Sequence, residues 1–161
     1  MNCSHCDLPL EPAVRDYSIT RYHAPLCREH QAWFDQMIHD SSKYTTKPHL
    51  LLYLRLRQLG ANPLLNYFDG HKTVDIAIGA AHLHLEVDGI HHHDHYQAIS
   101  DLKRTIYDLE TDIVTIRIPN ALVKYDLFGC ADQLLKIINR RQGFPVTKRD
   151  GLKRAIALWT R

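Results

Sequence analysis

The chain has 161 residues, of which 45% are hydrophobic and 24% charged, and its formal net charge is +2 at pH 7. This length and composition allow one domain with a small appendage and exclude a disordered chain. The chain has no apolar run of membrane-spanning length and no signal-peptide pattern at its start, so we expect a cytoplasmic protein with no membrane partner. The isoelectric point of about 8.4 permits nucleic-acid binding without requiring it.

Two short ligand motifs open the chain and predict a structural zinc site. In each motif two side chains that can bind a metal are spaced by two residues, and the four candidates are Cys3, Cys6, Cys27 and His30. Three thiolates and one imidazole close a zinc tetrahedron, and cysteines in the cytosol are more often metal ligands than disulfide partners. His5 and His23 are alternatives for the fourth position.

We place a zinc-binding module at residues 1–39, with a short helix over 31–38. So short a segment holds too little hydrophobic core to fold alone, so the metal would supply its stability. The segment from Tyr17 to Gln31 resembles small zinc modules appended to bacterial and phage DNA-binding proteins. That resemblance implies a role in holding nucleic acid. Cys130 lies alone in an apolar run and is expected in the core.

The remaining elements follow from hydrophobic periodicity and from turn residues. A polar stretch at 40–46 predicts a linker, and Thr46 can cap a helix that begins near Pro48 and ends at Gly60. The pattern then predicts strands at 64–68, 73–78, 83–88 and 113–118, and helices at 94–109, 127–140 and 151–159.

Acidic residues fall on two strands that we expect to form a hairpin. Asp75 lies on the first strand, and Glu86 and Asp88 lie on the second. Carboxylates this close repel one another unless a cation lies between them, and oxygen ligands suit Mg²⁺ or Mn²⁺. The alternatives are that Asp75 and Glu86 keep a sheet face polar, and that Asp88, before Gly89, is a turn residue.

Four separated motifs resemble those of the PD-(D/E)xK nuclease superfamily. They lie within the range 46–140 and read Val74-Asp75-Ile76, Leu85-Glu86-Val87-Asp88-Gly89-Ile90-His91-His92, Asp101-Leu102-Lys103-Arg104 and Val114-Thr115-Ile116-Arg117-Ile118-Pro119-Asn120. Within the superfamily the chain is most similar to small bacterial proteins related to very-short-patch-repair endonuclease. The resemblance implies a restriction-endonuclease-like α/β core over 46–140, with helix, three-strand meander, helix, strand and helix in that order.

The resemblance also implies roles for individual residues. Asp75, Glu86 and the main-chain carbonyl of Val87 would bind the catalytic metal, and His92 would orient or activate water. Asp88 stands where the superfamily has a lysine, so the cation that stabilises the transition state is unassigned; Lys103 or Arg104 are candidates. The relatives' glutamate on the first helix is also missing, and His49 occupies that region.

Basic residues extend the expected DNA-binding surface toward the C-terminal segment 141–161. Those singled out for nucleic-acid binding are Arg104, Arg117, Arg140, Arg141, Lys148 and Arg149. Charged runs are also common as solvated faces, and Arg117 fits a structural ion pair equally well. His82 and His84 share the face of Glu86 by alternation, so they either line the same cleft or lie on its rim. The histidines of the run 91–95 form either a solvated loop or an adventitious site for Zn²⁺, Ni²⁺ or Cu²⁺. For all of these histidines except His92, we favour the surface role.

These features favour a Mg²⁺- or Mn²⁺-dependent DNA endonuclease or nickase that acts on duplex DNA. One alternative is a nucleic-acid-binding protein that keeps the nuclease fold with impaired catalysis, and another is a histidine-rich metal-handling protein. Whether the protein forms a homodimer, cuts one strand or two, or acts on RNA is left open, as is its recognition sequence.

Overall fold

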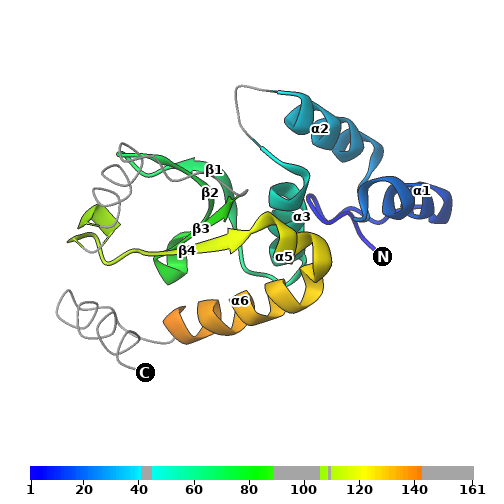
Figure 1. The fold of residues 1–161 in the computed structure, drawn as a ribbon. Coiled ribbons are helices and arrows are strands. Elements are labelled where there is room, and N and C mark those ends of the chain that lie inside the picture. Colours follow the sequence, from blue (N-terminus) through cyan, green and yellow to red (C-terminus); the bar gives the residue numbers. More distant parts are fainter. Residues whose placement is uncertain (41–44, 89–105, 109, 143–161) are drawn as a thin grey trace.

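The computed structural model describes residues 1–40, 45–88, 106–108 and 110–142. This part of the chain is an α/β protein with three N-terminal helices, a mixed four-stranded sheet and two C-terminal helices (Figure 1). The predicted α/β class is confirmed at this level. Within the described ranges, every helix is too short or too polar to span a lipid bilayer.

The first two helices form the N-terminal module. Helix α1 (Pro12–Tyr22) begins with proline at a position where the missing N–H costs nothing, and α2 (Arg28–His39) follows. Helix α1 was not predicted, and α2 begins at residue 28 rather than at the predicted residue 31. The two helices pack through the edge-to-face rings of Tyr22 and Phe34, whose centroids lie 5.3 Å apart.

Helix α3 (Lys47–Gln58) lies between this module and the sheet (Figure 1). Its N-cap is Thr46, whose side chain accepts a hydrogen bond from the His49 N–H, as the sequence predicted. The helix is buried on most sides, and its buried residues are Pro48, His49, Leu50, Leu52, Tyr53, Leu54 and Leu56. Its leucines join those of the N-terminal module and of the sheet in one continuous hydrophobic core.

The sheet has the order β1-β2-β3-β4. The first three strands, β1 (Leu64–Phe68), β2 (Thr73–Ile78) and β3 (Leu83–Asp88), are antiparallel neighbours. Strand β4 (Val114–Pro119) lies parallel to β3, at the far edge of the sheet from β1. The predicted strands are found at these positions, with the last one shifted by a single residue. A 3-10 turn, η2 (Gly79–Ala81), joins β2 to β3.

The two faces of the sheet differ in chemistry. One face is apolar, because Ile76 pairs with Leu85 and Leu85 with Ile116. Alternation puts His84 and Glu86 of β3 on the other face, opposite Thr115 and Arg117 of β4 respectively. Both His84 and Glu86 are buried.

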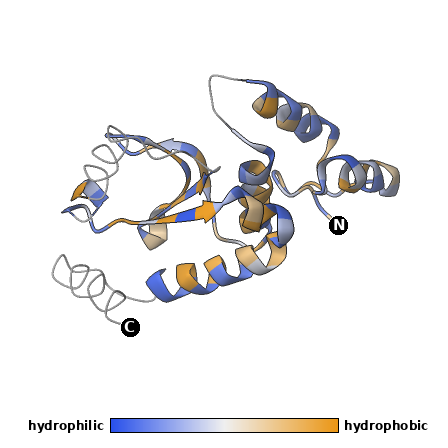
Figure 2. Ribbon diagram, viewed as in Figure 1, coloured by the Kyte–Doolittle hydropathy of each residue, from blue (hydrophilic) through white to orange (hydrophobic). Residues whose placement is uncertain are grey.

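Helices α5 (Asn120–Tyr125) and α6 (Leu127–Gln142) follow β4 and pack with α3. Figure 2 shows apolar and polar stripes along α6, as expected for a helix with one buried face. The prediction of a helix at 127–140 is confirmed, whereas α5 was not predicted. Most of the expected helix at 94–109 and all of the one at 151–159 lie outside the described residues; 106–108 are helical.

Candidate functional site

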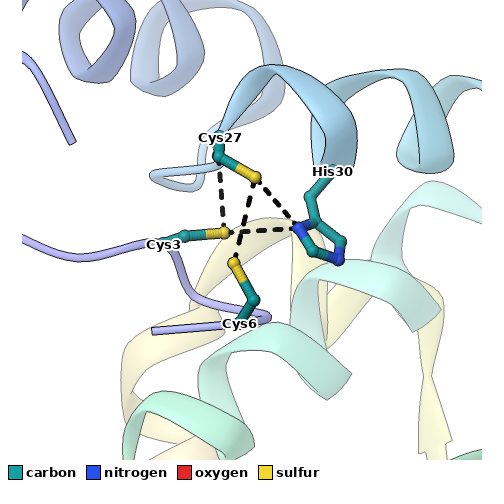
Figure 3. A group of neighbouring side chains, drawn as sticks. All are labelled: Cys3, Cys6, Cys27 and His30. Atoms are coloured by element: carbon teal, nitrogen blue, oxygen red, sulfur yellow. Dashed lines mark hydrogen bonds between the residues drawn. The ribbon is translucent and has the colours of Figure 1, made fainter. Parts of the chain in front are cut away.

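Three thiols and one imidazole converge at the N-terminal end of the fold (Figure 3). Their ligand atoms all lie within 4.8 Å of one another, and the residues are Cys3, Cys6, Cys27 and His30. The Cys6 and Cys27 sulfurs are 3.9 Å apart, and His30 Nδ1 lies 3.0 Å from Cys27 Sγ and 3.8 Å from Cys3 Sγ. Tetrahedral zinc sets such edges at about 3.5–3.8 Å, so this cluster can bind zinc after small adjustments.

Backbone hydrogen bonds hold the first pair of cysteines in a tight turn. Cys3 N–H donates to Leu8 O at 2.8 Å, Asp7 N–H donates to Cys3 O at 2.9 Å, and Asp7 takes a left-handed φ of 63°. Ser4 N–H donates to Pro25 O at 2.8 Å, which joins this turn to the loop before Cys27. Backbone hydrogen bonds therefore hold both cysteine-bearing segments in place.

A fully buried serine positions the loop that carries Cys27. Ser18 Oγ on α1 donates to Ala24 O at 2.8 Å and accepts from Leu26 N–H at 2.9 Å. His30 follows in the first turn of α2, so its ring reaches the same point as the Cys27 sulfur. Helix α1, which the sequence analysis missed, thus helps to position this ligand pair.

The electrostatics of the cluster favour a bound cation. Burial acts to raise the pKa of Cys3, but N–H groups of Cys27, Cys6 and His5 outweigh it and lower that pKa. Burial and the neighbouring thiol groups raise the pKa of Cys27 to about 11. The Cys27 thiol therefore resists ionisation unless a cation offsets its charge.

The alternative ligands have other positions. His5 stacks on the His30 ring with centroids 4.2 Å apart, and burial lowers the pKa of His5 to about 4. His23 caps the end of α1 in a left-handed conformation. Cys130 is buried in the hydrophobic core, as expected.

Asp75 and Glu86 lie at the point where β2 and β3 part, within strands that still pair with β1 and β4 respectively. The pairing of the two strands runs to Ile76 and Leu85, so Asp75 and Glu86 are the next residues on each strand. Asp75 Oδ2 accepts a hydrogen bond of 2.7 Å from Val87 N–H. The other oxygen, Oδ1, lies 3.9 Å from Nδ1 of His49.

His49 reaches this point from the first turn of α3. Its Nε2 lies 2.8 Å from the carbonyl oxygen of Asp75, which can only accept, so Nε2 carries the proton. Burial lowers the pKa of His49 more than Asp75 raises it, so the ring is neutral and Nδ1 presents its lone pair toward Asp75.

Two cations hold the carboxylate of Glu86. Lys72 Nζ lies 3.8 Å from Oε1, and Arg117 Nε lies 3.3 Å from Oε2 and 3.9 Å from an oxygen of Asp88. Arg117 thus makes the structural ion pair that was one of its two predicted roles. Lys72, whose side chain is only 7% exposed, was not singled out from the sequence.

Histidine, cysteine, aspartate and glutamate side chains can bind metals. Within the described ranges, only two sets of three or more of them bring their ligand atoms within 4.8 Å of one another. The first is the cysteine cluster, and the second consists of Asp69, His84 and Asp108. Asp75, Glu86 and Asp88 do not form such a set. Of the histidines expected on the surface, His84 is buried, whereas His82 is exposed.

Other residues expected from the sequence are only partly placed. His92, Lys103, Arg104, Lys148 and Arg149 lie outside the described residues. Arg140 is exposed near the end of α6. Arg141 donates to the carbonyl oxygens of Ala81, His82 and Asp112, so it ties α6 to the sheet.

Comparisons with known proteins do not assign the chain to a family. A scan of protein-family models, a search of curated proteins and a search of solved structures each found no match.

Proposed function

We propose that this protein is a metal-dependent DNA endonuclease or nickase with a restriction-endonuclease-like core. The observation that carries the proposal is that Asp75 and Glu86 are the first residues beyond the paired part of β2 and β3, with Asp75 held by the Val87 N–H next to Glu86. The order of α3, three antiparallel strands, the parallel strand β4 and α6 also agrees with the core that the motifs imply.

The residues around Asp75 fit a divalent cation. The Val87 N–H fixes one oxygen of Asp75 and leaves Oδ1 to face the lone pair of His49 Nδ1 at 3.9 Å. Two acceptors that face each other at this distance repel, and a cation between them removes the repulsion. His49 therefore takes the place of the glutamate that the relatives carry on this helix.

When Mg²⁺ or Mn²⁺ is bound by Asp75, Glu86 and the Val87 carbonyl, it supplies a polarised phosphate and a water of lowered pKa. Arg117 lies beside Glu86 and Asp88, with 46% of its side chain exposed. Its guanidinium can therefore transfer from these carboxylates to a phosphate of the substrate and offset the charge of the transition state. This assigns to Arg117 the task of the missing lysine.

We also assign a structural zinc ion to the cysteine cluster. Its four protein ligands fill a tetrahedron and leave no open position for substrate, which is the arrangement of structural rather than catalytic zinc. The module contacts α3 through Gln58, whose amide donates to Ser4 Oγ at 2.6 Å. Zinc would thus stabilise both the module and its packing against the core.

One observation favours a second candidate, a nucleic-acid-binding protein with impaired catalysis. Glu86 is already held by Lys72 and Arg117, so a divalent ion must compete with two cations for its carboxylate. If that competition fails, the fold binds DNA without cutting it.

Nicking of supercoiled plasmid in Mg²⁺ or Mn²⁺ separates the two candidates. We expect Asp75→Asn and Glu86→Gln to slow nicking by roughly 10²–10³-fold, the usual loss when one group that stabilises transition-state charge is removed. Asp132→Asn, an exposed change on α6, is the matched control and should leave the rate unchanged. Equal rates in all variants would refute the assigned site, and DNA binding without cleavage by the intact protein would favour the second candidate.

A further inference from the structure

A second group of metal-binding side chains lies on the polar face of the sheet, the face that also carries Glu86. Asp69 comes from the turn after β1, His84 from β3 and Asp108 from the helical segment 106–108. Their ligand atoms all lie within 4.8 Å of one another. The exposed fractions of the three side chains are only 4%, 6% and 9% respectively.

Each of these side chains has a buried polar atom without a hydrogen-bond partner, although the one on Asp108, Oδ1, lies 3.2 Å from the Lys72 ammonium. Asp69 Oδ2 and His84 Nδ1 face each other at 3.9 Å, which is too long for a hydrogen bond. The other oxygen of Asp69 accepts from the N–H groups of His71 and Lys72, each at 2.8 Å. An unpartnered donor or acceptor in the interior is costly, so this pair of atoms indicates a missing ligand.

Lys72 is not the absent partner of Asp69 Oδ2 and His84 Nδ1. Its ammonium lies 3.2 Å from Asp108 and 3.8 Å from Glu86, and these two carboxylates share it. Asp69 and His84 therefore face each other without a cation of their own.

We propose that Asp69, His84 and Asp108 bind a divalent transition-metal ion. One imidazole nitrogen with two carboxylates suits Mn²⁺ or Zn²⁺ better than Mg²⁺ or Ca²⁺, which prefer all-oxygen sites. At bonds of about 2.1 Å and ordinary coordination angles, two ligand atoms lie about 3.0–3.4 Å apart, so ligand atoms that are now up to 4.8 Å apart must close by at most about 2 Å. Waters would complete the coordination shell.

The ion would join elements that are distant in the sequence. The turn that carries Asp69 already contacts the 106–108 segment, because Tyr107 Oη donates to Asp69 O at 3.2 Å and the rings of His71 and Tyr107 stack at 4.7 Å. A metal bound between this turn, β3 and the 106–108 segment would hold them together on the polar face. Its role is therefore structural. Its three ligands differ from those of the proposed cleavage site, although Lys72 lies between Asp108 and Glu86.

Mn²⁺ binding measured by electron paramagnetic resonance tests this site. The protein is first loaded with zinc at its N-terminal cluster, and it carries Asp75→Asn so that the proposed catalytic ion does not contribute. Histidine clusters bind Mn²⁺ only weakly, so the run 91–95 should not bind it strongly. We expect one bound Mn²⁺ per chain, with the coupling of an imidazole nitrogen in the pulsed spectrum, and no displacement by equimolar Mg²⁺.

Asp69→Asn keeps the side-chain oxygen that accepts hydrogen bonds from the N–H groups of His71 and Lys72, so it should preserve the fold. It should weaken Mn²⁺ binding by at least about 100-fold, since loss of even a residue that only supports a metal ligand costs 10–100-fold in affinity. His82→Gln, an exposed change next to β3, should leave binding unchanged. Absence of the bound ion, absence of the nitrogen coupling, or unchanged affinity in Asp69→Asn would each overturn the proposal. None of these results depends on nicking activity, so the two proposals fail independently.

Discussion

Replacement of Lys72 by methionine removes the ammonium group from the buried polar face and keeps most of the side chain. Nζ of Lys72 lies 3.2 Å from Asp108 and 3.8 Å from Glu86, in a side chain that is 7% exposed. Removal of one partner from a buried ion pair costs about 3–5 kcal/mol, because it leaves an uncompensated charge. Glu86 keeps Arg117 and Asp108 keeps the hydroxyl of Thr115, so we expect the lower value, about 3 kcal/mol.

Urea unfolding followed by circular dichroism measures this loss. For a slope of about 1–3 kcal/mol/M, the unfolding midpoint should fall by about 1–3 M. Lys136→Met, an exposed change on α6, is the matched control and should change the free energy of unfolding by less than about 0.5 kcal/mol. If Lys72→Met lies within about 1 kcal/mol of this control, Lys72 does not neutralise the buried carboxylates as argued.

Three further predictions concern the zinc cluster, the core and DNA binding. Cys27→Ser should remove one zinc per chain by atomic absorption, whereas the core change Cys130→Ser should keep it; equal zinc content in both variants would exclude the cluster. Because Ile138 is only 1% exposed, Ile138→Ala should lower the free energy of unfolding by about 2–4 kcal/mol. Ile137→Ala, at the half-buried neighbouring position, should lower it by clearly less, and equal losses in the two variants would contradict the packing of α6. DNA affinity should fall steeply with salt, and Arg140→Gln should reduce the slope of log K against log salt by about 1; an unchanged slope would remove Arg140 from the interface.

The strands could be predicted from the sequence because local signals agree there. Alternation in 73–78 and 83–88 meets turn residues at either end, and Gly70 takes the positive φ of 98° that such a turn needs. The cysteine cluster was also predicted in full, since its ligands come as two close pairs in the sequence.

Other parts carry no local signal. Helix α1 has a weak apolar stripe, and the residue that fixes it is a buried serine, Ser18, which sequence patterns treat as polar. Lys72, Asp69 and Asp108 read as ordinary surface charges, because only the tertiary fold brings the β1–β2 turn over β3. The one usable clue was His84, which by alternation shares a sheet face with Glu86.

The central claim is that Asp75 and Glu86 hold one divalent ion between them. Anomalous diffraction from crystals soaked in Mn²⁺ tests it directly, because Mn²⁺ scatters anomalously and carbon, nitrogen and oxygen do not. We expect a peak about 2.0–2.3 Å from Asp75 Oδ1 and from an oxygen of Glu86, with Arg117 moved off Glu86. A map with no peak there, and with Glu86 still paired to Lys72 and Arg117, would contradict the nuclease proposal.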